Sequence, residues 1–328
     1  MITRFAPAPT GWLHLGHVLN AEYVWGALLR GVPDPRGHQP RVLLRIEDHD
    51  RERCRPEYEA GILDDLDWLG YRPDIFPTDR FRAGRCDGRQ SDRGSVYYEA
   101  LEILRAQGLV YACDCTRRDI EGRVAERGGR GAGCGVRRAS GVRRAGSGGL
   151  GAGRGVGGAA RGEITEGAEI RYDGHCRDRG LALADGTGWR VRMDPGVEPF
   201  VDLRLGPQAQ DPSEQCGDVL IRDRLGNWTY QFCVSADDDR QGVDLVIRGE
   251  DLLASTGRQM RLARLLGRET PAAFLHHALI MKSPDQKLSK SDGDTGVREL
   301  RARGWTPDEV KRAAVTSIPS APSTPRTN

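Results

Sequence analysis

Two histidines near the N-terminus stand where a nucleotide phosphate could bind. His14 and His17 belong to the stretch APAPTGWLHLGH, which begins at Ala6, follows an apolar strand signal and precedes an amphipathic helix signal. In an open α/β sheet, ligands bind beyond the strand ends, where a loop delivers the chain to a helix N-terminus. Glycines there let the backbone approach a ligand, and the unpaired N–H groups attract phosphate oxygens. The simpler interpretation is a turn whose histidines cap the helix or face solvent.

Two lysines form a second candidate phosphate site near the other end of the chain. Lys287 and Lys290 lie in KLSKS, residues 287–291, although only four of the 49 Lys and Arg residues are lysines. The compact ammonium of lysine suits a phosphate that moves during a reaction, whereas arginine suits a fixed bidentate partner. The rarity of lysine favours a function for this segment over a solvated charged loop.

The composition of the whole chain is that of a soluble protein. It holds 328 residues with a net charge of +2, no signal sequence, and no run approaching the roughly 18 apolar residues of a membrane span. Its eight cysteines are too sparse for a disulfide scaffold, and the close pair Cys113 and Cys115 suggests a metal site. We therefore expect a cytoplasmic monomer in a reducing compartment.

One segment departs from this composition. Residues 121–162 hold nine arginines against two glutamates, many glycines and few large apolar side chains. Such a segment buries too little surface to offset the entropy of ordering, so we expect a disordered insertion. Basic disordered segments can follow an RNA backbone, and the alternative is a solvated loop of biased composition.

Strand and helix signals alternate along the rest of the chain. Expected strands are residues 2–6, 41–47 and 244–248; expected helices are 18–30, 56–69, 96–107, 255–266 and 307–315. The last helix follows a capping box between Thr306 and Glu309, with Pro307 at the first helical position. The alternation predicts an α/β fold, a Rossmann-like doubly wound parallel sheet with helices on both faces.

Taken together, the motifs resemble a known family. HLGH and KLSKS are similar to the HIGH and KMSKS signatures of class I aminoacyl-tRNA synthetases. RFAPAPTGWLHLGH, RIED at residues 45–48 and VIRGEDLL at residues 246–253 resemble the glutamyl branch. The resemblance covers residues 1–118 and 168–295. Only 37 residues follow Ser291, too few for the anticodon-binding region of an ordinary glutamyl-tRNA synthetase, so the chain most resembles the glutamyl-queuosine tRNA(Asp) synthetases.

The resemblance implies ATP-dependent activation of glutamate, with Mg²⁺ accompanying the ATP. His14, Gly16, His17, Lys287 and Lys290 would bind ATP and stabilise the charge that develops on its phosphates. The implied glutamate-binding residues are Arg4, Ala6, Ala8, Glu47, Tyr230 and Arg248. Ala8 is a departure, because the family usually has serine there, and a hydroxyl contact to glutamate is then missing. Arg248 has an alternative role as a structural ion-pair partner of Glu250 or Asp251.

The resemblance also implies one structural zinc ion. Cys113, Cys115 and Cys176 would be ligands, and the fourth is Tyr172 by resemblance or His175 by ordinary zinc chemistry, in which histidine is far commoner. The alternative is free cysteines. The expected organisation is a catalytic core at residues 1–295, a zinc-binding subdomain within it at 113–176, and a short helix with a flexible tail at 296–328.

Three functions follow from this. The leading one transfers glutamate to the queuosine base in the anticodon of tRNA(Asp). The alternatives are a truncated glutamyl-tRNA synthetase that charges the 3′ end of tRNA(Glu), and a catalytically weak paralogue that binds RNA or a nucleotide.

Overall fold

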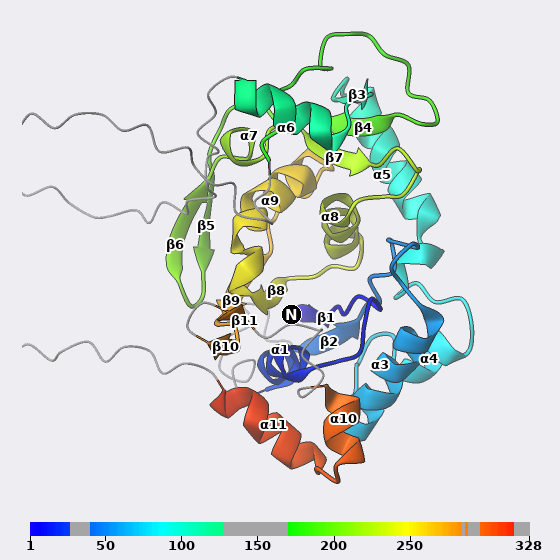
Figure 1. Ribbon diagram of the computed structural model, residues 1–328, viewed down its shortest axis with the longest axis vertical. Helices are drawn as coiled ribbons and strands as arrows, with labels where there is room; N and C mark the ends of the chain where they lie inside the picture. The colour runs from blue at the N-terminus through cyan, green and yellow to red at the C-terminus, as the bar shows by residue number, and fades with distance from the viewer. Residues whose placement is uncertain (27–39, 127–169, 284–285, 288–295, 318–328) are drawn as a thin grey trace, which may run out of the picture.

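A six-stranded sheet forms the centre of the molecule (Figure 1). The computed structural model describes residues 1–26, 40–126, 170–283, 286–287 and 296–317. In spatial order the strands are β2 (Arg41–Leu44), β1 (Ile2–Phe5), β8 (Leu245–Gly249), β9 (Ala273–His277), β5 (Glu198–Asp202) and β6 (Gly206–Gln210). Every neighbouring pair is parallel except β5 with β6. The predicted parallel α/β sheet is confirmed, with one antiparallel edge strand.

Helices cover both faces of this sheet, and each face has its own core. The main helices are α1 (Leu15–Trp25), α3 (Pro56–Leu69), α4 (Thr78–Arg82), α5 (Gly94–Ala106), α8 (Tyr230–Arg240) and α9 (Thr256–Leu265). One core joins β1 and β2 to α1 and α3 through Phe5, Val18 and Leu66. On the other face, Val246 and Phe274 form a smaller cluster with Met260 of α9. A further core joins α5, α8 and α9 to a second sheet through Leu101, Phe232 and Leu262. The shorter elements are η1 (Gln90–Asp92), α7 (Pro212–Gln215), η2 (Glu250–Ser255), β10 (Met281–Ser283) and β11 (Gln286–Lys287).

Local signals set several boundaries. The prediction for α3 is confirmed at both ends: Pro56 occupies the first helical turn, and Gly70 ends the helix in the left-handed region at φ 79°. Helix α1 begins three residues before the predicted start because the side chain of His14 caps it. The helix ends at Trp25, followed by Gly26 in an extended conformation, before the predicted end at residue 30, which itself lies outside the described residues. The strand predicted at 41–47 stops at Leu44, and a single bridge follows at Ile46.

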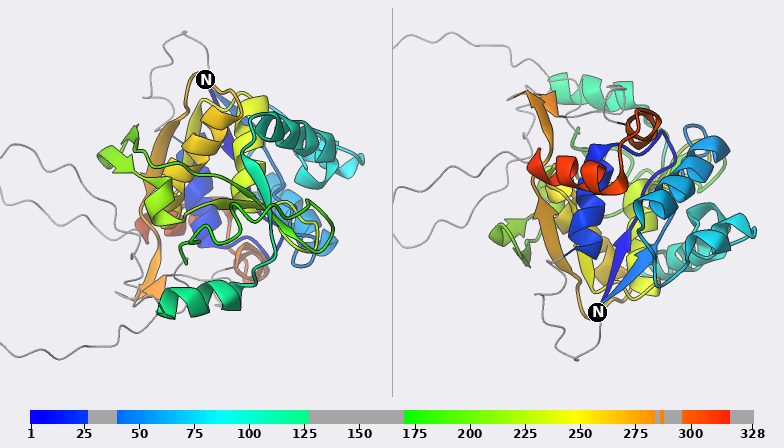
Figure 2. Two further views of the ribbon diagram at one scale, coloured as in Figure 1. Left: turned by 90° about the horizontal axis from the view of Figure 1, so that it is seen from above. Right: turned by 90° about the horizontal axis from the view of Figure 1, so that it is seen from below.

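A smaller antiparallel sheet lies at one end of the molecule. It consists of β3 (Val110–Cys113), β4 (Gly188–Val191) and β7 (Val219–Arg222), with α6 (Arg117–Glu126) beside it (Figures 1 and 2). Residues 121–126 belong to α6, so the first six residues of the predicted disordered insertion are helical. Asp119 and Thr116 exchange hydrogen bonds at the helix start, and Ile120 is buried. The rest of the predicted insertion lies outside the described residues.

The opposite end is built by α10 (Val297–Ala302) and α11 (Pro307–Thr316). The capping box between Thr306 and Glu309 is confirmed. The sequence predicted a single short helix beyond the core; the structure has two. Val297, Leu300, Val310 and Ala314 are buried in the core formed around α1, so both helices pack on the main sheet's core rather than extending beyond it. Among the described residues, no helix is long and apolar enough to cross a membrane.

Candidate active site

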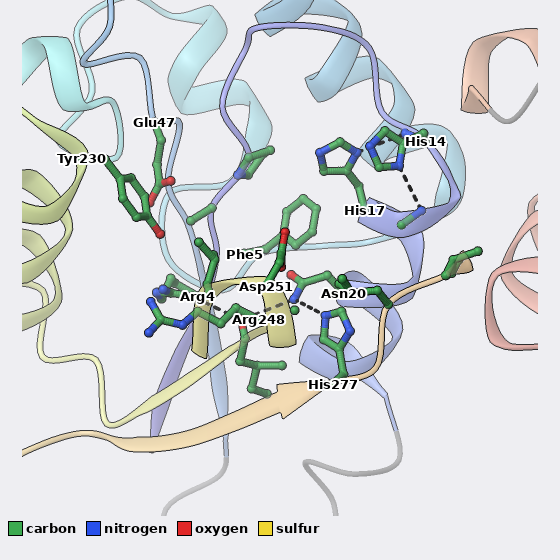
Figure 3. Close-up of a pocket in the computed structure, with 18 residues that line it drawn as sticks. Arg4, Phe5, His14, His17, Asn20, Glu47, Tyr230, Arg248, Asp251 and His277 are labelled. Atoms are coloured by element: carbon green, nitrogen blue, oxygen red, sulfur yellow. Dashed lines mark hydrogen bonds between the residues drawn. The ribbon is translucent and has the colours of Figure 1, made fainter. Parts of the chain in front are cut away.

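A cavity of about 420 Å³ opens beyond the carboxyl ends of β1 and β8 (Figure 3). This is the location predicted for a ligand site in an open parallel sheet. Of the residues predicted from the sequence, the cavity is lined by Arg4, Ala6, His14, Gly16, His17, Glu47, Tyr230 and Arg248. Ala8 is absent from the lining residues, and its carbonyl accepts a hydrogen bond from the N–H of Thr10.

The structure describes only part of the lysine motif at residues 287–291. The backbone of Lys287 lies in β11, where it pairs with Met281 of β10. Its side chain and the whole of Lys290 lie outside the described part of the chain. Their predicted contact with phosphate therefore stays a prediction.

The two histidines form the start of α1 together. The Nδ1 atom of His14 accepts a hydrogen bond from the N–H of Gly16 at 3.0 Å, and Nδ1 of His17 accepts from the N–H of His14 at 3.1 Å. Their ring centroids lie 4.0 Å apart. Because each Nδ1 is an acceptor, the proton of the neutral ring lies on Nε2. Both imidazoles are therefore arranged to donate hydrogen bonds to an anion through Nε2.

The loop before these histidines is fixed by Trp12. The indole packs edge-on against Tyr58 with centroids 4.9 Å apart, and the guanidinium of Arg298 lies 4.7 Å from the ring on its face. A Cβ atom at Gly61 of α3 would overlap the ring of Trp12, so the helix approaches the indole at the one residue without a side chain. The loop thus rests on α3 and α10 at once.

Buried charges lie behind the cavity, on the side away from the histidines. Asp238 of α8 accepts hydrogen bonds from Nε of Arg4 at 3.2 Å and from Nη2 of Arg45 at 2.6 Å. Arg45 also donates to Gln241 at 3.0 Å and is completely buried. Sequence reasoning missed Arg45 and Asp238; the only available signal for Arg45 was its place in the RIED motif.

Glu47 presents a carboxylate oxygen to the cavity. Its side chain is buried, and Oε1 has no hydrogen-bond partner among the described residues. That oxygen forms an ion pair with Nε of Arg45 at 3.5 Å, longer than a normal hydrogen bond. Burial raises the pKa of Glu47 above its ordinary value, an effect that Arg45 and Arg4 partly offset. Figure 3 shows Tyr230 beside Glu47 on the side of the pocket opposite the histidines.

Arg248 is held by neutral groups. Its guanidinium donates to Nε2 of His276 at 3.0 Å, to Oε1 of Gln259 at 2.6 Å and to Oγ1 of Thr256 at 2.9 Å. The alternative ion pair with Glu250 is not observed, because Glu250 pairs with Arg204. Burial lowers the pKa of Arg248, and the positive charge of Arg4 adds to that effect. Arg248 is thus a buried cation that borders a cavity.

The side of the cavity below the histidines contains residues that the sequence did not single out. Nδ2 of Asn20 lies 3.0 Å from Nε2 of His277, whose Nδ1 lies 2.9 Å from the carbonyl oxygen of Ala278. Tyr23 stacks on His277 at 4.9 Å between ring centroids. Asp251 also lines the cavity.

The three cysteines predicted to bind zinc lie together at the smaller sheet. Their sulfur atoms are all within 4.8 Å of one another, with 3.5 Å between Sγ of Cys115 and Sγ of Cys176. The hydroxyl of Tyr172 lies 3.5 Å from Sγ of Cys113, whereas His175 is exposed and outside this cluster. Sulfur atoms around a tetrahedral zinc ion at 2.3 Å are about 3.8 Å apart, so the residues present fit such an ion.

Three arginines surround this cysteine cluster. Arg123 and Arg179 each place a guanidinium nitrogen 3.4 Å from sulfur, of Cys115 and Cys176 respectively. Arg190 lies over the ring of Tyr172 at 3.7 Å. Burial raises the pKa of Cys113, but the hydrogen bond with Tyr172 and the charge of Arg190 outweigh it and hold that pKa below the ordinary value. Positive charge at this distance favours thiolates, the form that binds metal.

Comparison with known proteins decides the family. Residues 1–138 and 190–316 match the model for tRNA synthetases class I (E and Q), catalytic domain. The chain belongs to this family. It is 36% identical to the glutamyl-Q tRNA(Asp) synthetase of Rhodobacter capsulatus over 95% of this chain and 99% of that protein. It is also 36% identical to the enzyme of that name from Bordetella bronchiseptica, over 89% of this chain and 75% of the relative. The chain is therefore a ligase of the aminoacyl-tRNA synthetase type.

Glutamate–tRNA ligases are similar over a smaller share of their length. The ligase 2 of Syntrophus aciditrophicus is 34% identical across 94% of this chain but 55% of that protein. A solved glutamate–tRNA ligase from Elizabethkingia meningosepticum, in complex with its amino acid, aligns with a TM-score of 0.63 and 25% identity. That alignment covers 90% of this chain and 52% of the ligase, so the synthetase described here spans about half the length of these relatives.

In this synthetase, one cavity combines donors for an anion with charges of both signs. His14 and His17 lie at one side, while Arg4 and Arg248 lie at the other with the carboxylate of Glu47. These charges complement an amino acid that carries an ammonium and two carboxylates. One carboxylate would face the arginines, and the α-carboxylate would face the histidines.

Proposed function

We propose that this synthetase activates L-glutamate with ATP and transfers it to the queuosine base in the anticodon of tRNA(Asp). The observation that carries the proposal is a single cavity lined by the buried carboxylate of Glu47 and the buried guanidinium of Arg248. This pair of opposite charges complements a ligand that carries both an ammonium and a carboxylate. Glutamate supplies both.

In the first step, the α-carboxylate oxygen of glutamate attacks the α-phosphorus of ATP. An oxygen–phosphorus bond forms and the bond to pyrophosphate breaks, which gives glutamyl-adenylate. Glu47 would hold the α-ammonium and Arg248 the side-chain carboxylate, while Nε2 of His14 and His17 would donate to phosphate oxygens. Mg²⁺ would travel with the phosphates as part of the nucleotide substrate, and Lys287 and Lys290 are proposed from the sequence motif to add positive charge.

In the second step, a hydroxyl of the cyclopentenediol of queuosine attacks the glutamyl carbonyl carbon. An ester bond forms, AMP leaves, and the hydroxyl proton passes to solvent. Two adjacent hydroxyls resemble a ribose diol, so one cavity can place either beside the adenylate. The glutamyl-Q names of relatives that match over most of their own length support this acceptor.

We propose zinc as a structural cofactor, held by Cys113, Cys115, Cys176 and the hydroxyl of Tyr172. The ion would join β3 to the turn that contains Cys176 and so stabilise the smaller sheet. It takes no part in the two steps above.

The test is glutamate transfer to purified tRNAs with and without queuosine. We expect pyrophosphate exchange to depend on glutamate without RNA, and labelled glutamate to appear in the anticodon fragment of queuosine-bearing tRNA(Asp) after nuclease cleavage. Exchange that begins only when tRNA is added would contradict the branch assignment. Label at the 3′-terminal adenosine of tRNA(Glu), with none on the queuosine tRNA, would support a truncated glutamyl-tRNA synthetase instead.

A further inference from the structure

The buried surroundings of Arg248 fix the orientation of its guanidinium. A guanidinium has five N–H donors in one plane, and three are directed to His276, Gln259 and Thr256. The plane of the guanidinium is therefore fixed from three directions. A carboxylate has two oxygens that can accept from such a plane only when its tilt is correct.

His276 can hold Arg248 only in one protonation state. Nε2 of His276 faces the N–H on Nε of Arg248, so Nε2 must be the unprotonated acceptor. Its other nitrogen, Nδ1, lies 2.7 Å from Oδ2 of Asp202 and therefore carries the proton. Both side chains are completely buried.

Asp202 is fixed as an ionised acceptor. It accepts backbone hydrogen bonds from Arg204 at 3.0 Å, Leu205 at 2.8 Å and His276 at 3.0 Å, besides the imidazole bond. Burial raises its pKa, but these hydrogen bonds outweigh burial and leave the pKa below the ordinary value. An ionised carboxylate cannot donate, so it selects the imidazole tautomer with the proton on Nδ1.

We propose that Asp202 and His276 are positioning residues that orient Arg248 toward the side-chain carboxylate of glutamate and so set the preference for glutamate over glutamine. The inference rests on the proposed function, because it assigns a task to Arg248 within it. Neither residue lines the cavity, so each acts through Arg248. A purely structural alternative exists, since the pair also links β5 to β9.

Two variants distinguish an effect of the His276 tautomer from an effect of side-chain packing. Asp202→Asn keeps the size of the side chain, but its amide can donate to Nδ1. The proton of the imidazole then moves to Nε2, where it opposes the N–H of Arg248. We expect the KM for glutamate to rise about tenfold or more, with the KM for ATP within about twofold, because a hydrogen bond to a charged group is lost. The preference for glutamate over glutamine should fall with it.

His276→Gln supplies the rescue. A glutamine oxygen can still accept from Arg248, and its orientation is not governed by residue 202. We expect His276→Gln alone to have a mild effect, and the double variant Asp202→Asn/His276→Gln to recover most of the glutamate KM lost in Asp202→Asn. Glu198→Gln is the matched control: it removes a buried charge on the same strand, where Glu198 pairs with Arg261 and Arg264. It should lower the melting temperature and leave the glutamate KM unchanged.

The outcomes separate the two proposals. Wild-type protein without glutamate-dependent pyrophosphate exchange overturns the proposed function and this inference with it. Wild-type exchange combined with an unchanged glutamate KM in Asp202→Asn overturns the inference alone. A double variant worse than either single variant, or a rise in both KM values, shows a structural role and also overturns it. If Asp202→Asn does not fold, ¹⁵N NMR of His276 in the wild type must still show the proton on Nδ1; a proton on Nε2 rejects the inference.

Discussion

Replacing Glu47 with glutamine tests whether the negative charge of this side chain binds the ammonium of glutamate in the proposed complex. A hydrogen bond to a charged group contributes about 1.5–3 kcal/mol and a neutral one about 0.5–1.5 kcal/mol. In the proposed complex the ammonium of glutamate donates to the carboxylate of Glu47, and the substitution replaces this charged acceptor with a neutral one. Glu47→Gln should therefore weaken glutamate binding by about 1–1.5 kcal/mol, or roughly five- to tenfold in KM. Glutamate-dependent pyrophosphate exchange measures this, with the KM for ATP as internal reference.

Glutarate provides the sharpest comparison, because it has both carboxylates and no ammonium. As an inhibitor of exchange, it should bind Glu47→Gln as well as or better than wild type, since it has no ammonium for the carboxylate of Glu47 to hold and its own carboxylates are no longer repelled by that charge. Equal weakening of glutarate and glutamate would refute the assignment of Glu47 to the ammonium. Glu59→Gln is the control, because Glu59 pairs with Arg89 and does not line the cavity.

The same carboxylate predicts a pH dependence. Binding of an ammonium needs ionised Glu47, whose pKa burial raises. The KM for glutamate should therefore rise as the pH falls through that raised pKa, beginning above the ordinary carboxyl range. Glu47→Gln has no such titration, so a wild-type profile that matches the variant's profile would contradict this explanation.

Three further predictions concern stability and metal content. Purified protein should contain about one zinc per chain by elemental analysis, lost in Cys176→Ser and kept in His175→Ala; zinc loss in His175→Ala would reassign the fourth ligand. Burial raises the pKa of Asp65 to about 7, so the folded state holds this proton more tightly than the unfolded chain, and stability falls as the pH rises from about 4 to about 7. Asp65→Asn should thus raise the melting temperature at pH 8 but not at pH 4, and equal shifts would argue against it. Gly61→Ala should lower both stability and exchange activity, because the added methyl group displaces the ring of Trp12. Gly122→Ala, with open space around it, should stabilise the protein by up to about 1 kcal/mol in a denaturant titration. Stabilisation by both substitutions would show that the Trp12 ring moves aside without cost.

The sequence predicted helix ends correctly where residues close in the sequence set them. Pro56 and Gly70 set both ends of α3, and Thr306 with Glu309 sets the start of α11. The start of α1 was predicted three residues late, although a histidine cap was the simpler interpretation of this stretch, because histidine is not among the usual N-cap residues. Nδ1 of His14 accepts from Gly16 and Nδ1 of His17 accepts from His14, and spacing alone does not show these backbone partners.

Partners far apart in the chain were not predictable in the same way. Asp238 meets Arg4 and Arg45 across 234 and 193 residues, and Asp202 meets His276 across 74. These contacts exist only because the parallel sheet brings strand ends together. Motif residues could be named from the sequence, whereas the buried groups that orient them required the fold. Ala8 shows the converse, because a motif position expected in the pocket lies outside the lining residues.

The spacing of the three sulfur atoms also exposes this end of the molecule to oxidants. Cys113 has a lowered pKa but is buried, whereas Cys115 is partly exposed, so peroxide that reaches the cluster forms a sulfenic acid on one of these two sulfur atoms. A neighbouring cysteine within 4.8 Å then condenses with it, forming a disulfide and releasing water. A disulfide there removes two of the thiolates that a metal needs. In the proposed zinc site, metal binding and oxidation would thus compete for the same atoms, so peroxide would weaken the smaller sheet while the cavity at the main sheet stays chemically intact.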